Sequence, residues 1–345
     1  MRAPFLLALV APALVAGCGH AQRDAAGGAE SGAVSDARLP LSLVRDVELP
    51  GRANRFDYQD IDSSRGRLFI AHMHDNALVA VDLAEVKVAG VVPNIPTARG
   101  VVVAPEIGRV FVTALPNQVV IVDAASLAEV GRVTTGRGPD GIAWDGRDEI
   151  VAVSDQSDGA VSLLHDRGVG ARMRVVVGAE TGNVVYDATR HAFWVTAERS
   201  DGPDQLVGID PIAATVTTRI DLPGCEAAHG LRLHPDGQSA LVACEGSSTL
   251  ARVTLDGGHA IVTARTGSGP DVLSIDPGLG WLYVAAESGD LTVFDLGAPG
   301  LVKIDSEHPG DNAHTVAADP STHRVYFPLS VGPNGKPVLR VMAPR

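Results

Sequence analysis

GPDVLSID (269–276) and WLYVAAE (281–287) are two short apolar runs joined by a turn, and LTVFDL (291–296) and LVKIDS (301–306) follow them. Valine, leucine, isoleucine and aromatic residues fill these runs, while glycine, proline and aspartate occupy the breaks between them. This alternation is typical of short antiparallel strands joined by tight turns. The segment therefore predicts a unit of four strands.

The same unit recurs seven times along the chain. The residues that open the units are Asp57, Arg99, Asp140, Gly182, His229, Asp271 and His314. They lie about 40 residues apart, and a period of that length with four short strands per unit is typical of a propeller blade. The sequence therefore predicts an all-β fold, a seven-bladed β-propeller that occupies residues 41–345 as one domain.

The last unit contains only three apolar runs, AHTVAADP (313–320), HRVYFPLS (323–330) and KPVLRVMA (336–343). A further run, LSLVRDVELP (41–50), precedes the first unit. We therefore expect this N-terminal strand to close the last blade, which would hide two strand edges that otherwise promote aggregation.

Residues 1–17 have the features of an export signal, because Arg2 precedes an apolar run that is too short to span a bilayer. The run ends in LVAGC (14–18), which resembles a bacterial lipoprotein lipobox. The resemblance implies cleavage before Cys18, lipidation of its thiol and a place at the periplasm-facing outer membrane or the cell surface. Ordinary secretion, with cleavage near the same place, is the alternative. Residues 18–40 would then comprise the lipidated cysteine and a flexible tether.

Two cysteines remain if lipid occupies Cys18, an even number in an oxidising compartment. Cys225 lies just before the first predicted strand of the fifth blade, and Cys244 ends the second. Since these strands are antiparallel, both thiols should emerge on the same face. We therefore predict a disulfide between them; two free buried thiols or a metal pair are the alternatives.

The composition excludes some classes of partner. The formal net charge is −13, and aromatic residues make up 4% of the chain. An acidic surface repels nucleic acid. We therefore expect no nucleic-acid partner, contact with a membrane only through the lipid anchor, and a monomer.

Several repeats resemble those of the YVTN-type, YncE-like β-propeller family. GRGPDGIA (136–143) and GSGPDVLS (267–274) match its Gly-Pro-Asp-Gly opening, FWVTAE (193–198) matches its second strand, and LVAVDL (78–83) matches its third. The resemblance covers roughly residues 41–343 and implies the propeller fold. Related propellers bind proteins, bind metals or hydrolyse lactones, so the resemblance alone does not choose a function.

Two rings of side chains are expected at one mouth of the central channel, where innermost strands start and second strands end. The inner ring consists of the seven residues that open the units. The second ring consists of Met73, Leu115, Asp155, Glu198, Glu245, Glu287 and Ser330. The ionisable members form the predicted ligand-binding set: Asp57, Arg99, Asp140, His229, Asp271, His314, Asp155, Glu198, Glu245 and Glu287.

A metal ion is one way to compensate this clustered charge, which otherwise costs energy. The candidate metal ligands are Glu198, Glu245, Glu287, His229 and His314. Carboxylates suit Ca²⁺ or Mg²⁺, and carboxylates mixed with imidazoles suit Zn²⁺ or Mn²⁺. The alternatives are that Asp140 and Asp271 cap turn backbone, that solvent alone accommodates the acids, and that the histidines only pack.

Two functions fit these observations. The first is an envelope-anchored binding protein that presents its channel mouth or rim to a protein, peptide or glycan. It is favoured because no CxxCH, GxSxG, HExxH or P-loop motif lies in a fitting context and no catalytic residue can be assigned. The second is a metal-dependent hydrolase or lyase, lactonase-like, in which a metal polarises a carbonyl and a carboxylate or histidine moves a proton.

Overall fold

A computed structural model describes residues 41–345, apart from 166, 168–169 and 171. The expectations for the export signal at residues 1–17, for Cys18 and for the tether up to residue 40 lie outside the described residues. Within the described part of the chain, no helix is long and apolar enough to cross a membrane.

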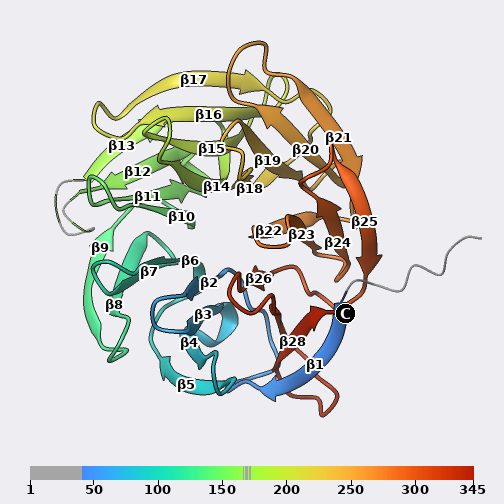
Figure 1. Cartoon of the computed structure of the whole chain (residues 1–345). Coiled ribbons are helices and arrows are strands. Elements are labelled where there is room, and N and C mark those ends of the chain that lie inside the picture. The colour runs from blue at the N-terminus through green and yellow to red at the C-terminus, as the bar shows by residue number, and fades with distance from the viewer. Residues whose placement is uncertain (1–40, 166, 168–169, 171) are drawn as a thin grey trace, which may run out of the picture. The chain divides into compact units, whose positions relative to one another are not determined.

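The described chain forms seven four-stranded antiparallel sheets, the blades of a propeller (Figure 1). Blade 1 comprises β2 (Gln59–Asp62), β3 (Arg67–His72), β4 (Ala77–Asp82) and β5 (Lys87–Val92). Blade 2 comprises β6 (Ala98–Ala104), β7 (Arg109–Ala114), β8 (Gln118–Asp123) and β9 (Glu129–Thr134). Blade 3 comprises β10 (Pro139–Asp145), β11 (Ile150–Asp155), β12 (Ala160–Leu164) and β13 (Arg172–Val176). Blade 4 comprises β14 (Glu180–Asp187), β15 (Ala192–Glu198), β16 (Gln205–Asp210) and β17 (Thr215–Asp221). Blade 5 comprises β18 (Ala228–Leu233), β19 (Ser239–Cys244), β20 (Thr249–Thr254) and β21 (Ile261–Arg265). Blade 6 comprises β22 (Pro270–Asp276), β23 (Trp281–Ala286), β24 (Leu291–Asp295) and β25 (Val302–Glu307). Blade 7 comprises β26 (Ala317–Ala318), β27 (Val325–Leu329), β28 (Val338–Pro344) and β1 (Leu41–Glu48).

The innermost strands form a closed ring around a central channel. Each of β2, β6, β10, β14, β18, β22 and β26 contacts the innermost strand of the next blade, and β26 contacts β2. The predicted seven-bladed propeller is therefore confirmed.

The N-terminal strand closes the last blade, as the sequence predicts. β1 pairs antiparallel with β28, from Leu41 opposite Pro344 to Glu48 opposite Val338 (Figure 1, blue beside red). The blade differs from expectation at β26, which is only two residues long. Continuing its register with β27 would set Thr315 opposite Pro328, which has no N–H to offer the ladder.

The core lies between neighbouring blades rather than within them. Phe69 and Leu78 of blade 1, for example, share one buried cluster with Val101, Val110 and Val120 of blade 2. Middle strands are buried on both faces by this stacking, which explains why their sequences are continuous apolar runs. Small β-branched side chains fill the narrow gaps, so few aromatic residues are needed.

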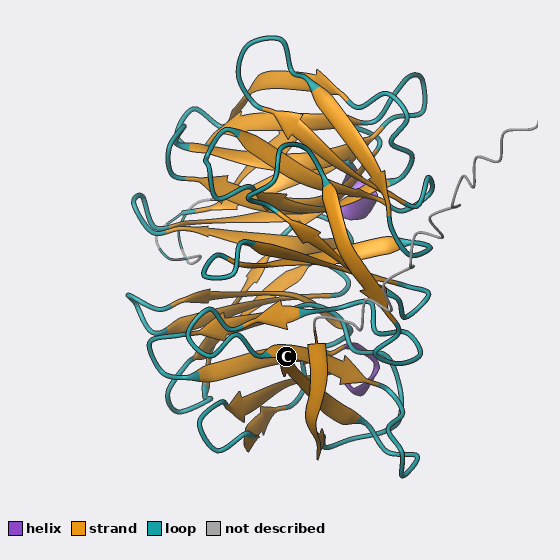
Figure 2. Ribbon diagram, turned by 45° about the vertical axis from the view of Figure 1, so that its right-hand side comes forward, coloured by secondary structure: helices purple, strands orange, loops and turns teal. Residues whose placement is uncertain are grey.

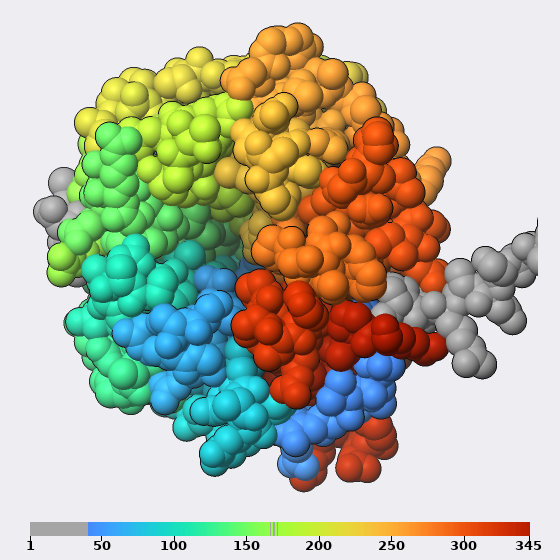
Figure 3. Space-filling view, in the orientation of Figure 1, coloured from blue at the N-terminus to red at the C-terminus, as the bar shows by residue number. Residues whose placement is uncertain are grey.

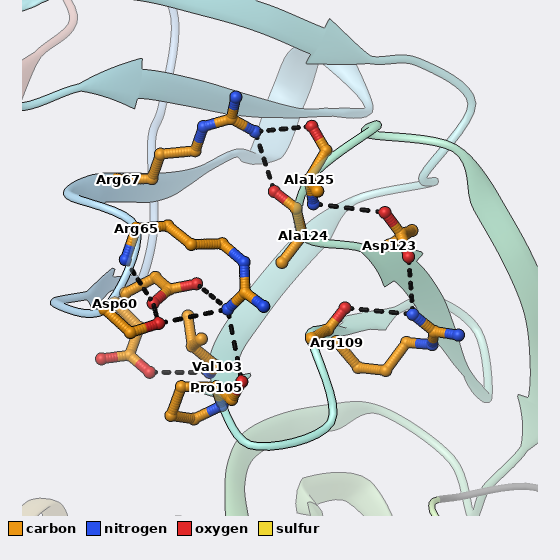
Figure 4. Close-up of polar contacts among 12 residues, drawn as sticks. Asp60, Arg65, Arg67, Val103, Pro105, Arg109, Asp123, Ala124 and Ala125 are labelled. Carbon is orange, nitrogen blue, oxygen red and sulfur yellow. Dashed lines mark hydrogen bonds and ion pairs between the residues drawn. The ribbon is translucent and has the colours of Figure 1, made fainter.

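Polar contacts also join the blades at their edges (Figure 4). Arg67 Nη1 of blade 1 donates to the carbonyl oxygens of Ala124 and Ala125 of blade 2, both at 2.8 Å. Asp60 Oδ2 accepts from the backbone N–H of Val103 at 2.8 Å. These bonds fix the angle between neighbouring blades.

The predicted disulfide between Cys225 and Cys244 is confirmed. The Cα atoms lie 5.1 Å apart, within the range that a disulfide requires. The bridge joins the segment just before β18 to the end of β19, as the antiparallel pairing predicts.

Two short 3₁₀ helices, η1 (Met73–Asp75) and η2 (Gln156–Asp158), follow the second strands of blades 1 and 3 and lie on the same side of the ring (Figure 2). The last residue of each binds an arginine that precedes the innermost strand. Asp75 accepts from the backbone N–H and from Nε of Arg52, both at 2.7 Å. Asp158 accepts from the same two groups of Arg137, at 2.9 and 2.7 Å.

The Asp75 contact predicts a pH dependence of stability. Burial acts to raise the pKa of Asp75, but hydrogen bonds from Arg52 and Asn54 outweigh it and lower the pKa to about 2. Because the folded-state pKa is depressed, this stability is present above the unfolded pKa near 4 and is lost as the pH falls towards 2. We expect Asp75→Asn to cost about 1–2 kcal/mol at pH 7, and less at pH 3. Urea unfolding at both pH values measures this, and an equal loss at both would contradict it.

Candidate functional site

A cavity of about 370 Å³ opens at one mouth of the channel. The ring is hollowed at its centre in the space-filling view (Figure 3). The cavity is lined almost wholly by polar and charged side chains: Arg55, Asp57, Tyr58, Met73, Arg99, Asp140, Gln156, Glu180, Glu198, His229, Glu245, Asp271 and Glu287. Seven of these are carboxylates and three are basic. Such an excess of acid within one cavity favours a cationic occupant.

Bulges at the start of the innermost strands position the inner ring. The register against the second strand slips in blades 2 to 6, between Ala98/Val101, Pro139/Ile142, Thr181/Val184, Ala228/Leu231 and Pro270/Leu273. The inner-ring residue of each of these blades lies within the slip. A bulge bends the strand and re-aims its side chains, so these residues turn away from the ladder.

Glycines after the ring residues let neighbouring bulges approach closely. A Cβ on Gly230 would lie 1.8 Å from the carbonyl oxygen of Asp271, and one on Gly100 would lie 2.1 Å from that of Asp140. The second strand adds a hydrogen bond, since Thr196 Oγ1 donates to the carbonyl oxygen of His229 at 2.8 Å. The ring backbone is therefore held from two sides.

We expect Gly230→Ala to destabilise the propeller by about 1–3 kcal/mol, because the new methyl group must displace backbone. It should also weaken ligand binding at the mouth, since the displaced atom belongs to Asp271. Urea unfolding measures the first effect. The matched control is Gly131→Ala in β9, where a Cβ meets nothing within 4 Å. Equal midpoints for the two variants would show that the close approach does not matter.

His229 lies at the centre of the acidic cluster. Its Nε2 lies 3.4 Å from Asp140 Oδ2 and 3.7 Å from Asp271 Oδ1, and its Nδ1 lies 3.9 Å from Glu245 Oε1. Tyr58 Oη lies 3.1 Å from the same Nε2. Burial acts to lower the pKa of His229, but the surrounding carboxylates, Asp140 above all, outweigh it and raise the pKa to about 10.

The carboxylates of the cavity repel one another. Burial raises the pKa of Asp57 to about 7, and the charge of Asp140 adds to the effect. Burial likewise raises the pKa of Asp271 well above its usual range, and it raises the pKa values of Glu198 and Glu245. The three basic residues therefore do not neutralise the cavity.

Asp140 and Glu287 are the exceptions. Burial acts to raise the pKa of Asp140, but His229 and Arg99 hold it below its usual value. Glu287 forms a two-bonded ion pair with Arg55, at 2.6 and 3.1 Å, and accepts from Asn312 Nδ2 at 2.7 Å. These bonds lower the pKa of Glu287 against the opposing effect of burial.

Two groups of side chains in the mouth have metal-ligand geometry. His229, Glu245 and Asp271 form one triad, and Asp271, Glu287 and His314 form another; in each, the ligand atoms lie within 4.8 Å of one another. Asp271 is 4% exposed, and its Oδ1 has no hydrogen-bond partner among the described residues. His314 is 1% exposed, and within the described chain its Nε2 is likewise unpartnered. Both atoms are therefore available to coordinate a ligand.

A third acidic group, Asp145, Asp148 and His191, lies at the turns between β10 and β11 and between β14 and β15. Asp276 and His323 make the same type of contact between blades 6 and 7, with Nδ1 and Oδ2 at 2.7 Å. The repetition indicates a contact between blades rather than a metal site.

The structure brings most of the predicted site together. Eight of the predicted residues line the cavity, namely Asp57, Arg99, Asp140, His229, Asp271, Glu198, Glu245 and Glu287. His314 is buried next to Asp271 and Glu287 and does not line the cavity. Glu198, a predicted metal ligand, lines the cavity but belongs to neither triad.

Asp155 does not line the cavity. It is the last residue of β11, and its side chain points into the blade, where it accepts from Gly136 N at 2.9 Å and Ser162 Oγ at 2.6 Å. Gln156, one residue later, takes the expected place and accepts from Arg99 at 2.8 Å. The repeat alignment is thus shifted by one residue in blade 3.

Three residues that line the cavity, Arg55, Tyr58 and Glu180, are not in the predicted set. Arg55 lies two residues before Asp57, and Tyr58 lies directly after it. Glu180 lies two residues before Gly182. Each lies within two residues of an inner-ring residue, so a search of the residues on both sides of the inner ring could have included them.

The propeller is similar to several solved structures. Hydrazine synthase from Kuenenia stuttgartiensis is 16% identical, over 80% of this chain and 92% of that one, with a TM-score of 0.68. Virginiamycin B lyase from Staphylococcus aureus is 11% identical, over 87% and 99%, with a TM-score of 0.70. The Cps50 (Swd1) β-propeller domain of Myceliophteria thermophila is 12% identical, over 89% and 100%, with a TM-score of 0.69.

These identities are so low that the similarities show the fold alone. No family model matches the sequence, and no curated protein matches it. The resemblance to the YVTN-type family therefore stays a prediction, whereas the chain's architecture is that of a seven-bladed β-propeller.

Proposed function

We propose that this is an envelope-anchored binding protein whose channel mouth holds a divalent cation and, through it, a ligand. The observation that supports this best is Asp271, which is buried, has an unpartnered Oδ1 among the described residues, and belongs to both triads. Each triad combines two carboxylates with one imidazole, a set that favours Mn²⁺ or Zn²⁺ over Ca²⁺ or Mg²⁺. A cation there would also offset the repulsion among the carboxylates.

The proposed location rests on the N-terminal sequence and on the disulfide. The lipobox-like LVAGC (14–18) supports a lipid anchor on Cys18 at the outer membrane or cell surface. The disulfide between Cys225 and Cys244 supports an oxidising compartment. A protein, peptide or glycan of the envelope is the proposed partner, because its carbonyl, carboxylate or hydroxyl oxygens would complete the coordination of the cation.

Elemental analysis of the purified protein tests the proposal, together with melting curves in Mn²⁺, Zn²⁺, Ca²⁺, Mg²⁺ and chelator. Binding to the folded state alone stabilises by about 2.7 kcal/mol at a cation concentration of 100 Kd. We therefore expect Mn²⁺ or Zn²⁺ to raise the melting temperature and chelator to lower it. Identical curves under all conditions would show that the mouth is only a solvated acidic surface.

A metal-dependent hydrolase or lyase, for example a lactonase, is a second candidate. The observation that favours it is the contact between Tyr58 and His229, which sets two groups able to transfer protons beside the triad of Asp271, Glu287 and His314. The cation would supply polarisation of a substrate carbonyl. With the cation held by Asp271, Glu287 and His314, His229 would be free to move the proton, and its Nε2 faces Tyr58, Asp140 and Asp271.

A panel of lactones and esters with each added cation tests this second candidate. Turnover should require the cation, and Tyr58→Phe should lower it by about 10²–10⁴-fold while leaving cation affinity unchanged. If no cation supports turnover, the enzyme candidate fails and the binding function still stands.

A further inference from the structure

A second cavity, of about 260 Å³, lies in the channel. Its walls come from the innermost strands of blades 1, 5, 6 and 7, and the side chains that matter are Arg232, Ser274, Asp60 and the apolar Ile61, Ile275 and Val316. Arg232 and Ser274 each lie three residues beyond an inner-ring residue, His229 and Asp271. The cavity is therefore displaced along the channel from the acidic mouth.

Arg232 is a partly buried cation without a counter-ion. Its Nη1 donates to the carbonyl oxygen of Leu231 at 3.1 Å, and no other hydrogen bond or ion pair of its guanidinium occurs within the described chain. Burial lowers the pKa of Arg232, although the charge of Asp60 opposes this effect. Arg232 lines the cavity, so its remaining N–H groups can bind an anion there.

Asp60 does not serve as that partner. Its Oδ1 accepts from Ile61 N at 2.9 Å. Its Oδ2 accepts from Val103 N at 2.8 Å (Figure 4). Both oxygens are thus held by backbone. Asp60 remains a nearby acid, and it disfavours an occupant that bears two negative charges.

Ser274 offers a second donor. Its Oγ accepts from Ala318 N at 2.9 Å, and its own O–H has no acceptor among the residues that the structure describes. Ile61, Ile275 and Val316 supply apolar surface beside these donors. A cation, a hydroxyl donor and an apolar wall together suit a small amphipathic anion.

We propose that this cavity binds a small monocarboxylate with a short alkyl chain. The guanidinium of Arg232 would hold the carboxylate through two N–H groups, the geometry that arginine favours. The O–H of Ser274 would donate to the same carboxylate, and the alkyl chain would lie against the apolar wall. The site does not depend on the proposed cation, because none of the residues that line this cavity belongs to either triad.

Isothermal titration calorimetry of the full propeller with butyrate tests the proposal. The buffer contains a chelator so that no divalent cation is bound. Butyrate should bind saturably, acetate should bind roughly tenfold more weakly because it lacks two methylene groups, and neither inorganic phosphate nor butylamine should bind. Arg232→Gln should weaken butyrate binding about 10- to 100-fold, and Ser274→Ala about 2- to 10-fold.

Arg137→Gln is the matched control, since its side chain is 75% exposed and does not line the cavity, and it should leave butyrate affinity unchanged. If Arg232→Gln does not fold, Arg232→Lys keeps the charge but loses the fork geometry and should still weaken binding. No saturable butyrate binding, wild-type butyrate affinity in Arg232→Gln, or phosphate binding as tight as that of butyrate would each overturn the proposal.

Discussion

Asp271→Asn is expected to remove divalent-cation binding from the channel mouth. The carboxylate belongs to both triads, so no alternative set of three ligands survives its loss. Even changes to groups that only orient metal ligands cost 10–100-fold in affinity, so we expect the loss here to exceed about 100-fold. Titration with Mn²⁺ and Zn²⁺ measures the effect directly.

The same variant should fold at least as well as the wild type in chelator. Asp271 is buried beside Asp57, Glu245 and Glu287, and neutralising it removes repulsion. A lower cation affinity with an unchanged or higher melting temperature would therefore identify a residue kept for binding at the expense of stability. Asp311→Asn, at a fully exposed side chain near His308, is the control. Unchanged cation affinity in Asp271→Asn would exclude both triads.

Reduction of the Cys225–Cys244 disulfide is expected to destabilise the protein by about 3 kcal/mol, because the bridge closes a short loop in the unfolded chain. For a domain of this size that corresponds to a fall in melting temperature of roughly 5 °C. Melting curves with and without reductant measure it, and intact mass verifies that two hydrogens have been gained.

The double variant Cys225→Ala/Cys244→Ala provides the control, since its melting temperature should not respond to reductant. Both side chains are buried, so the variant also loses packing and should melt below the reduced wild type. If the fully reduced wild type has the same melting temperature as the oxidised protein, the bridge has no stabilising role.

Most of the fold could be predicted from the sequence because its unit repeats. The strands of blade 6 agree with prediction to within about two residues, from β22 to β25. Period and turn residues suffice for this, since both are local properties of the chain. The shortened β26 could not be predicted, because it depends on a proline in the neighbouring strand.

The candidate site was harder to predict, because a one-residue slip moves a side chain to the other face of a strand. Asp155 and Gln156 illustrate the point, since the repeat alignment selected buried Asp155 and not its neighbour Gln156, which lines the cavity. A wider window would have included Arg55 but not its ion pair with Glu287, which follows β23 in blade 6 and is 232 residues away in sequence. Such a contact depends on ring closure, which no local pattern encodes.

The pairing of β1 with β28 also constrains the order in which the molecule can assemble. β1 is the first described strand to be synthesised and its partner β28 is the last, so the circle cannot shut until the whole chain is available. Blades 1 to 6 contain only local pairings and can form as they emerge. Until the final strand arrives, the growing protein is an open arc with two exposed ends, so chains that terminate before residue 338 should be the ones that aggregate.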